Sequence, residues 1–278
     1  STAAGADMGT QLVDFNGDGR VDLLRAQSGS SKKAALNTGN GWKDVSPQWE
    51  SPTDFVDSSG NDLGVRLVDV NGDGLVDLLR GKDSTKDAWL NNGSGWVSSS
   101  AWNPPDVFTN SSRADNGLRL IDLNGDGLTD ILQDYKNVST TESEAFINNG
   151  NGWSNSSSWN SPEPFTKDGK NIGRRIGDIN GDGFGDIIIG YNDGSADIKI
   201  TLVRNSTVPY LLKNITNEFG GLTYLSYEKS TIYNNTGNDS LSDIGFNVWV
   251  VDEVLQNNSL YNDFGIFSNT SYLYLGGK

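Results

Sequence analysis

The sequence contains no cysteine and no histidine. Without cysteine, neither disulfides nor thiolate-bound zinc can hold the fold together. Without histidine, the chain lacks Ser-His-Asp and Cys-His catalysis, histidine-bound metals and the usual near-neutral general base. These absences exclude the mechanisms of many hydrolases and most transition-metal sites.

Basic clusters and long apolar runs are also missing. The formal net charge is -15, and no run of lysine and arginine could form a phosphate-binding surface, which argues against nucleic-acid binding. No apolar stretch approaches the length of a membrane span, and no signal peptide precedes Ser1. We expect no membrane span in this chain and expect it to be a mature or excised piece of a longer protein.

What the chain does contain favours strands. Gly, Asn, Ser and Asp are abundant in its 278 residues and helix formers are sparse, which is typical of short strands joined by turns. Eight Trp, nine Tyr and ten Phe supply enough bulky groups for a core. We therefore predict an all-β fold that needs something to neutralise its excess of carboxylates.

Four nearly identical acidic segments recur about every 55 residues, a period in the range of propeller blades. They are Asp14–Asp22 (DFNGDGRVD), Asp69–Asp77 (DVNGDGLVD), Asp122–Asp130 (DLNGDGLTD) and Asp178–Asp186 (DINGDGFGD). A glycine lies five residues before each one, at Gly9, Gly64, Gly117 and Gly173. A short apolar run follows each one, at 23–24, 78–79, 131–132 and 187–189. This pattern predicts a hairpin with the acidic loop between its two strands.

Three of the repeats continue with a third strand, a Gly-rich turn and two tryptophans. The third strands are at 34–37, 88–91 and 145–148, and the tryptophans are Trp42 and Trp49, Trp96 and Trp102, and Trp153 and Trp159. Each unit is therefore three or four antiparallel strands. The tryptophans could stack on sugar rings, but their regular recurrence favours a core between neighbouring repeats. The fourth repeat keeps its loop and loses this signature.

The acidic loops have the donors that calcium requires, namely six to eight oxygens from alternate side chains and a backbone carbonyl. Positions 1, 3, 5 and 9 supply side-chain oxygens, and position 7 supplies its carbonyl. The predicted ligands are Asp14, Asn16, Asp18, Arg20 and Asp22; Asp69, Asn71, Asp73, Leu75 and Asp77; Asp122, Asn124, Asp126, Leu128 and Asp130; and Asp178, Asn180, Asp182, Phe184 and Asp186.

An EF-hand would close with Glu at position 12, but that position is Arg25, Arg80, Gln133 or Ile189. A helical site is therefore excluded. Plain Asn-Gly and Asp-Gly hairpin turns are the alternative, yet such turns do not need three Asp and one Asn at fixed spacing. We predict about four Ca²⁺ ions, one per loop, which would neutralise about half of the net charge and make the metal part of the fold.

These loops and the strands after them resemble the FG-GAP and VCBS repeats of integrin-α-type calcium-binding β-propellers. The resemblance implies an all-β, β-propeller-like array of four calcium-loop repeats over residues 1–204, with repeats at about 9–62, 63–115, 116–171 and 172–204. The Phe-Gly element of that family is missing ahead of the acidic loops, and its Gly-Ala-Pro element is missing from the chain. Integrin-type propellers have seven blades, so the blade number stays open.

The remaining residues, 205–278, predict a smaller antiparallel β region. Residues 211–227 alternate around a Gly-Gly turn as a hairpin would, and 246–251 and 271–277 indicate further strands. The order of repeats and tail is similar to the middle region of toxin-complex B components and Rhs-type proteins. That resemblance implies a fragment of a larger surface or secreted protein.

The leading functional hypothesis is a non-catalytic extracellular scaffold or adhesion module. Its partner would be a protein, a glycan, or neighbouring subunits or domains of a larger assembly. A glycan-binding, lectin-like propeller is one alternative. A carboxylate-based glycoside hydrolase is another, but Glu50, Glu163 and Glu228 form no recognisable pair. Ten glycosylation sequons, at Asn92, Asn110, Asn137, Asn155, Asn205, Asn214, Asn234, Asn238, Asn257 and Asn269, would fit an extracellular surface.

Overall fold

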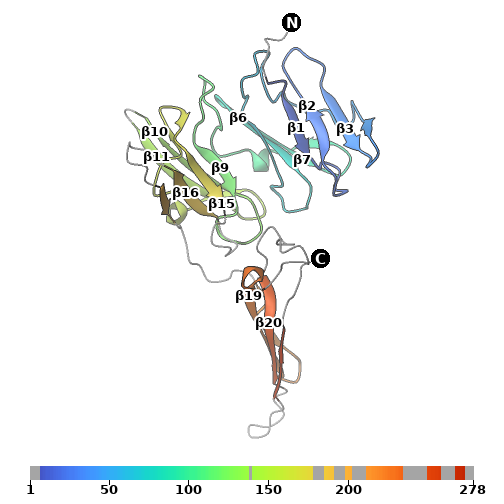
Figure 1. Cartoon of the computed structure of the whole chain (residues 1–278), viewed down its shortest axis with the longest axis vertical. Helices are drawn as coiled ribbons and strands as arrows, with labels where there is room; N and C mark the ends of the chain where they lie inside the picture. Colours follow the sequence, from blue (N-terminus) through green and yellow to red (C-terminus); the bar gives the residue numbers. More distant parts are fainter. Residues whose placement is uncertain are drawn as a thin grey trace. The chain divides into compact units, whose positions relative to one another are not determined.

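The computed structural model describes residues 7–137, 140–177, 185–190, 198–201, 211–233, 249–257 and 267–272. These residues form strands, turns and three short 3-10 helices, and Figure 1 labels the strands in chain order. They belong to two compact units, one with the sheets of the first three repeats and the other with the C-terminal sheet. Over this part of the chain, no helix is long and apolar enough to cross a membrane. The all-β prediction is confirmed.

The first repeat is a four-stranded antiparallel sheet whose strands follow chain order. Its strands are β1 (Thr10–Val13), β2 (Asp22–Arg25), β3 (Lys33–Asn37) and β4 (Trp42–Asp44). The acidic loop connects β1 to β2, and Val13 pairs with Asp22 where the loop closes. Leu24 is fully buried whereas Leu23 is only partly buried, as expected of a strand with one face on the core. The predicted hairpin around the first loop is confirmed.

The second and third repeats form equivalent sheets. The second contains β5 (Val65–Val68), β6 (Asp77–Lys82), β7 (Thr85–Asn91) and β8 (Trp96–Ser98). The third contains β9 (Leu118–Ile121), β10 (Asp130–Lys136), β11 (Thr141–Asn148) and β12 (Trp153–Asn155), with β13 (Thr166–Lys167) and β14 (Lys170–Asn171) added to it. Short 3-10 helices η1 (Ser100–Trp102) and η2 (Ser157–Trp159) follow β8 and β12.

In each of these repeats, the chain at the end of the second strand pairs with the segment that leads into the next repeat. In the third repeat, Tyr135 and Lys136 of β10 pair in parallel with β13. Single parallel bridges join Gln27 to Val56 and Lys82 to Thr109 at the equivalent places. This recurring contact fixes where each following repeat begins.

The fourth repeat and the tail contain the remaining strands. The fourth repeat has β15 (Arg174–Gly177), β16 (Asp186–Gly190) and β17 (Ile198–Thr201), in that order within one sheet. The tail has β18 (Asn214–Thr216), β19 (Leu222–Lys229), η3 (Ser230–Ile232), β20 (Trp249–Asn257) and β21 (Phe267–Ser271), and its four strands form one antiparallel sheet in chain order.

The predicted tail hairpin is confirmed, because β18 pairs with β19 and the Asn217 N–H donates to the Gly221 carbonyl at 2.9 Å across the turn. The two further predicted tail strands lie partly outside the described residues, at 246–248 and 273–277. Residues 249–251 belong to β20, whereas Ser271 ends β21 and Tyr272 lies beyond it. The predicted boundary between residues 204 and 205 also lies outside the described residues and stays a prediction.

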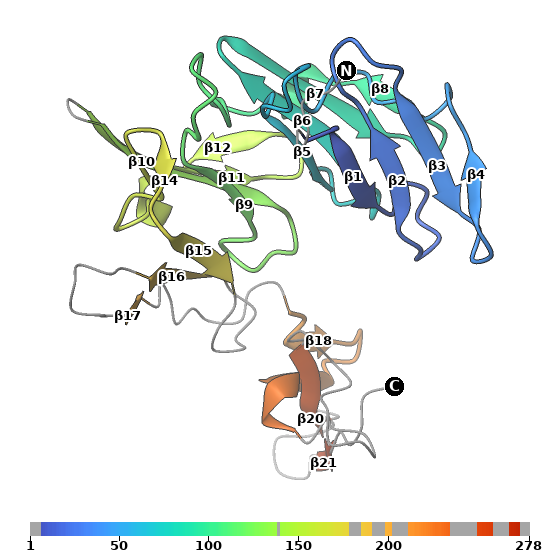
Figure 2. The same ribbon diagram turned by 45° about the horizontal axis from the view of Figure 1, so that its top comes forward.

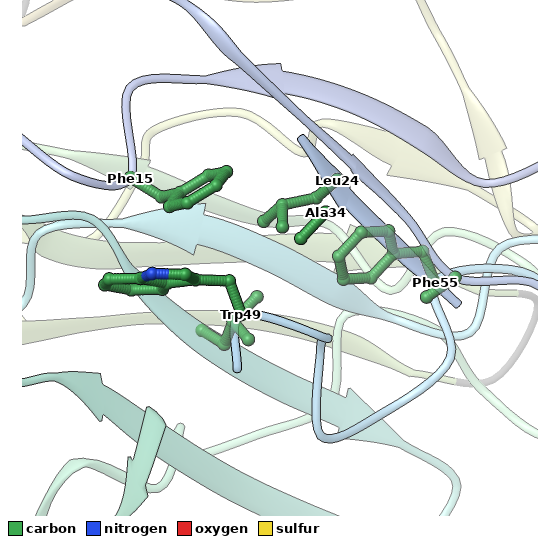
Figure 3. Packing of buried hydrophobic residues seen from close by; sticks show 7 residues of the cluster. Phe15, Leu24, Ala34, Trp49 and Phe55 are labelled. Atoms are coloured by element: carbon green, nitrogen blue, oxygen red, sulfur yellow. The ribbon is translucent and has the colours of Figure 1, made fainter. Parts of the chain in front are cut away.

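Buried side chains form the core between consecutive repeats, whose sheets β1–β4 and β5–β8 lie side by side (Figure 2). Trp49 lies with its ring centroid 4.9 Å from Phe15 and 5.9 Å from Trp96 of the next repeat. Figure 3 shows Trp49 beside Phe15, Leu24, Ala34 and Phe55. The Trp49–Trp96 pair is edge-to-face, and such pairs contribute roughly 0.5–1.5 kcal/mol beyond the area that they bury.

The second and third repeats pack against each other in the same way. The ring centroids of Trp102 and Trp153 lie 5.7 Å apart at 86°, and Trp102 is buried in a second cluster with Val70, Leu79 and Phe108. The predicted role of the tryptophans as core between repeats is confirmed for Trp49, Trp96, Trp102 and Trp153. Trp42 departs from this prediction, because 57% of it is exposed. Trp159 is only partly buried and belongs to neither of the two clusters.

The glycine five residues before each of the first three loops is required by both conformation and space. Gly64 has a φ of 69°, and a Cβ there would lie 2.2 Å from the Gly81 carbonyl oxygen. Gly9 and Gly117 have φ values of 65° and 76°, and their added Cβ atoms would be 2.4 Å and 2.3 Å from the carbonyl oxygens opposite them. Only glycine combines a positive φ with so close a backbone approach.

Candidate metal centre

In the first three acidic loops, the carboxylate at position 1 accepts hydrogen bonds from the loop backbone. Asp14 Oδ1 accepts the Gly17 N–H at 2.8 Å, and its Oδ2 accepts the Gly19 N–H at 2.7 Å. Gly17 and Gly19 have φ values of 74° and 83°, which a side chain would resist. Asp69 accepts the equivalent pair of N–H groups at 2.8 Å each, and Asp122 Oδ2 accepts the Gly127 N–H at 2.9 Å.

Positions 3 and 5 continue the turn through side-chain oxygens. Asn16 Oδ1 accepts the Asp18 N–H at 3.0 Å, and Asp18 Oδ1 accepts the Arg20 N–H at 2.9 Å. The second loop has the same two bonds at 3.1 Å and 2.9 Å, and Asn124 Oδ1 accepts the Asp126 N–H at 2.8 Å in the third. The fixed spacing of acidic and amide residues thus folds each of these three loops into a compact turn.

The position 9 carboxylate is the buried member of each loop. Asp22, Asp77 and Asp130 are 0% exposed. Asp77 Oδ2 accepts the Val70 N–H at 3.0 Å, and Asp77 Oδ1 accepts the Asn91 N–H at 2.8 Å. Asp22 and Asp130 bind the equivalent N–H groups at 2.7–3.3 Å. Each of these carboxylates therefore joins the loop to the third strand of its own repeat.

The carboxylates of a loop repel one another. Burial, together with the charges of Asp73 and Asp69, raises the pKa of Asp77 to about 6, although two backbone N–H bonds act to lower it. Burial also raises the pKa of Asp22, with the charges of Asp18 and Asp14 acting in the same direction. A cation near these oxygens would remove the repulsion and favour the ionised form.

Over the described part of the chain, no three Asp, Glu, His or Cys side chains lie close enough together to hold a metal ion. The donors themselves suit a hard cation, because they are carboxylate, amide and carbonyl oxygens. A carboxylate offers about four lone-pair sites, so an oxygen that accepts an N–H keeps capacity for a cation. The oxygen donors of the loops are therefore of the kind that calcium binds. To bind the ion, the carboxylates of a loop would have to lie closer together.

Position 7 distinguishes the first loop from the next two. The Arg20 guanidinium lies 2.7 Å from Asp18 Oδ2, so this loop already has a positive charge on one predicted ligand. Leu75 and Leu128 occupy position 7 in the second and third loops. The first loop is therefore expected to have the weakest electrostatic attraction for a cation.

The fourth loop is mostly outside the described residues, which exclude Asp178, Asn180, Asp182 and Phe184. Asp186 is described, and it is fully buried at the start of β16. Its position matches that of Asp22, Asp77 and Asp130 at the start of their strands.

Sequence reasoning missed the asparagine that ends each third strand. Asn91 Nδ2 donates to the Phe15 carbonyl of the preceding loop at 2.7 Å, and Asn148 Nδ2 donates to the Val70 carbonyl at 2.7 Å. Nearby, Leu75 reaches Gly17, where an added Cβ would lie 2.9 Å from the leucine. The recurrence of Asn at the end of the third strand was the available signal.

An Asp-x-Gly-x-Arg pattern was also missed. Asp62 forms a two-bond ion pair with Arg66 at 2.8 Å and 3.2 Å, and Asp115 forms one with Arg119 at 2.9 Å and 3.1 Å. Arg66 lies 5.1 Å from the ring centroid of Phe108, and Arg119 lies 5.2 Å from that of Phe165. These arginines stack on the aromatic residue that leads into the next repeat.

The loop and sheet geometry agrees with comparisons to known families. The FG-GAP-like repeat model matches residues 14–80 and 69–132, and the model of the insecticide toxin TcdB middle/N-terminal region matches residues 161–277. Residues 14–132 are thus similar to FG-GAP-like repeats, and residues 161–277 are similar to the TcdB middle/N-terminal region. Both resemblances recognised in the sequence are confirmed. No curated protein sequence matches the chain closely.

The chain is also similar to solved structures. A chain of the Photorhabdus luminescens Tc holotoxin pore is 19% identical with a TM-score of 0.57, and the match covers 90% of this chain and 12% of that one. An Agrocybe aegerita lectin that recognises terminal N-acetylglucosamine is 18% identical with a TM-score of 0.48, covering 94% of this chain and 65% of that one. The holotoxin likeness supports the predicted propeller-like array of FG-GAP-like repeats at the level of fold.

The FG-GAP-like and TcdB-type regions are structural parts of their proteins and not catalytic domains. Of the scattered glutamates considered for catalysis, Glu163 forms an ion pair with Arg174 at 3.1 Å. Glu228 is exposed on β19 and Glu50 is partly buried before the second repeat.

Proposed function

We propose that this chain is a non-catalytic, calcium-dependent scaffold within a larger toxin-complex-like protein, and that it docks against neighbouring domains or subunits. The chain spans 12% of the length of the holotoxin component that it resembles, so its partners would include other parts of one assembly. The family matches to FG-GAP-like repeats and to a TcdB-type region support this role. An extracellular location, with some of the sequons glycosylated, belongs to the same proposal.

The observation that carries the calcium part is the buried aspartate at position 9. Asp77 is fully buried and has a pKa raised to about 6 by burial and by two neighbouring carboxylates. A buried, ionised carboxylate is costly unless it is paired or bound to a metal. Calcium at Asp69, Asn71, Asp73, the Leu75 carbonyl and Asp77 would convert that repulsion into coordination. The same donors recur in the other loops.

Thermal unfolding of the intact chain with calcium and with excess chelator tests this proposal. An ion that binds only the folded chain adds about 2.7 kcal/mol per site at a hundredfold excess over Kd. We therefore expect calcium to raise the Tm by roughly 5 °C or more. Magnesium should restore less, because it requires tighter octahedral geometry.

Asp77→Asn and Asp83→Asn provide a matched comparison. Asp77 is buried in the second loop, whereas Asp83 lies in the β6–β7 turn with 39% of its side chain exposed. Asp77→Asn should remove one calcium equivalent in a calorimetric titration, and Asp83→Asn should leave the number bound unchanged. A Tm that chelator does not move, together with full calcium binding by Asp77→Asn, would contradict the proposal.

A further inference from the structure

One face of each later repeat covers the repeat before it, and this face recurs with the same residue types. We define the leading face as Leu67, Leu75, Asn91 and Trp96 in the second repeat and as Leu120, Leu128, Asn148 and Trp153 in the third. Leu67 and Trp96 pack against the core of the first repeat, and Leu120 and Trp153 pack against that of the second. The leading face is therefore an interface between repeats.

The opposite side of the contact is equally regular. We define the trailing edge of a repeat as the carbonyl at loop position 2, the glycine at position 4 and the carbonyl of the tryptophan after the fourth strand. Trp96 Nε1 donates to the Trp49 carbonyl at 3.3 Å, and Trp153 Nε1 donates to the Trp102 carbonyl at 3.4 Å. The asparagines of the leading face bind the Phe15 and Val70 carbonyls, and its leucines contact Gly17 and Gly72.

The first repeat carries the same leading face, and no described part of the chain covers its leucine and tryptophan. Leu12 is 65% exposed and Trp42 is 57% exposed, whereas their equivalents Leu67 and Trp96 are partly buried. Asn37 Nδ2 donates only to the carbonyl of Val21 in its own repeat at 3.2 Å, among the bonds that the described residues make. A terminal repeat that caps an array presents a polar outer face, and this face is apolar.

We propose that the leading face of the first repeat, formed by Leu12, Asn37 and Trp42, is the docking surface for a further FG-GAP-like repeat that presents a trailing edge. Its spare donors, Trp42 Nε1 and the second Asn37 Nδ2 hydrogen, match the two carbonyls of such an edge. Its leucine and tryptophan match the apolar surface around that edge in repeats 1 and 2. Burying both side chains supplies the driving force.

One position departs from the pattern. Arg20 stands where Leu75 and Leu128 contact a glycine, and its Nε donates to the Asn37 carbonyl at 3.0 Å while its guanidinium pairs with Asp18. The arginine stem can still cover the glycine of an incoming trailing edge, because long basic side chains bury their methylenes and keep the charge in water. This inference rests on the proposed scaffold role but not on calcium.

A tandem chain tests the proposal. A copy of residues 8–62 is inserted between Asp7 and Met8. The copied Asp62 then has the same spacing to the original Gly9 as Asp62 has to Gly64 in the native chain. The trailing edge of the copied repeat, which includes the copied Trp49, is thereby placed before the repeat that contains the original Trp42. Because a docked tryptophan loses far more on truncation than an exposed one, Trp42→Ser in the original repeat should lower the Tm of the tandem chain by roughly 5 °C or more. The same substitution in the native chain should change the Tm by less than about 2 °C.

Phe219→Ser is the control, because Phe219 is 77% exposed in the tail sheet unit and should affect both chains equally. Equal effects of Trp42→Ser in both chains, or separate melting of the added repeat, would overturn the proposal. So would sedimentation of the native chain as a dimer that Trp42→Ser dissociates, which would place a second copy on this face. The chain could show no calcium binding while Trp42→Ser still destabilises the tandem chain more than the native chain. The experiments therefore test the calcium proposal and the docking proposal separately.

Discussion

Asn91 Nδ2 donates to the carbonyl oxygen of Phe15 at 2.7 Å, across a sequence separation of 76 residues. The backbone N–H of the same asparagine donates to Asp77 Oδ1 at 2.8 Å. One buried residue therefore joins the acidic loop of the second repeat to that of the first. Asn148 makes the same pair of bonds between the second and third repeats.

Removing this link should destabilise the array. Asn91→Ala takes the side-chain donor away from a buried carbonyl, which costs about 1–3 kcal/mol when no replacement is found. Asn37→Ala removes the equivalent side chain where no preceding repeat is docked, so it should cost less than about 1 kcal/mol. Urea unfolding of both variants measures the difference. Equal losses would mean that the bond between repeats contributes nothing to stability.

Calcium affinity should depend on the residue at position 7. Arg20→Leu removes a guanidinium 2.7 Å from Asp18 Oδ2 and gives the first loop the residue found in the second and third. The loss of one positive charge beside the predicted site should tighten calcium binding at that loop by about 3- to 10-fold at low salt. Calorimetric titration at two salt concentrations measures this, with Arg66→Leu as a control remote from the loop. An unchanged affinity would argue that the first loop binds no cation near Asp18.

Two glycine substitutions can separate the stability lost through steric contact from the stability lost through backbone conformation. Gly64→Ala places a Cβ 2.2 Å from the Gly81 carbonyl oxygen, whereas Gly29→Ala meets nothing within 4 Å, although both glycines have positive φ. We expect a loss of about 1–2 kcal/mol for Gly29→Ala, from conformation alone, and at least about 3 kcal/mol for Gly64→Ala. Thermal unfolding compares the two. Similar losses would show that the backbone around Gly81 yields without cost.

Asp134 should make stability depend on pH. It occupies a buried position of β10 where the first two repeats have Ala26 and Gly81, and burial raises its pKa to about 6. The folded chain therefore binds this proton more tightly than the unfolded chain. The stability that Asp134 contributes is present below the unfolded pKa of 3.8 and is lost as pH rises through about 6.

Asp134→Asn tests this linkage, because it keeps the size of the side chain and removes the charge. At pH 7.5 the variant should be more stable than the parent by about 1–3 kcal/mol, and the difference should shrink toward pH 5. The nearby charged groups, Arg174 and Glu163, are unchanged in the variant. Urea unfolding in chelator excludes a contribution from metal binding. A difference that stays constant between pH 5 and 7.5 would contradict the shifted pKa.

Much of the fold follows from local pattern. The Asp-x-Asn-Gly-Asp-Gly spacing with apolar flanks predicted loops between paired strands, and Asp22 and Asp77 begin β2 and β6 as expected. The recurrence of tryptophan predicted the core between repeats, and Trp49 and Trp96 lie there. These features depend on residues within one turn or one hairpin, where side-chain alternation and glycine conformation act directly.

The repeat period and the chemistry of the loops are local properties, so they could be predicted from the residues alone. The exposure of one tryptophan, the asparagine bond between two loops and the burial of Asp134 became known from the folded chain. Trp42 and Trp96 carry the same local signature, yet only Trp96 has a preceding repeat to cover it. Such differences arise because burial and hydrogen bonding between repeats depend on partners about 50 or more residues away, which no local pattern specifies.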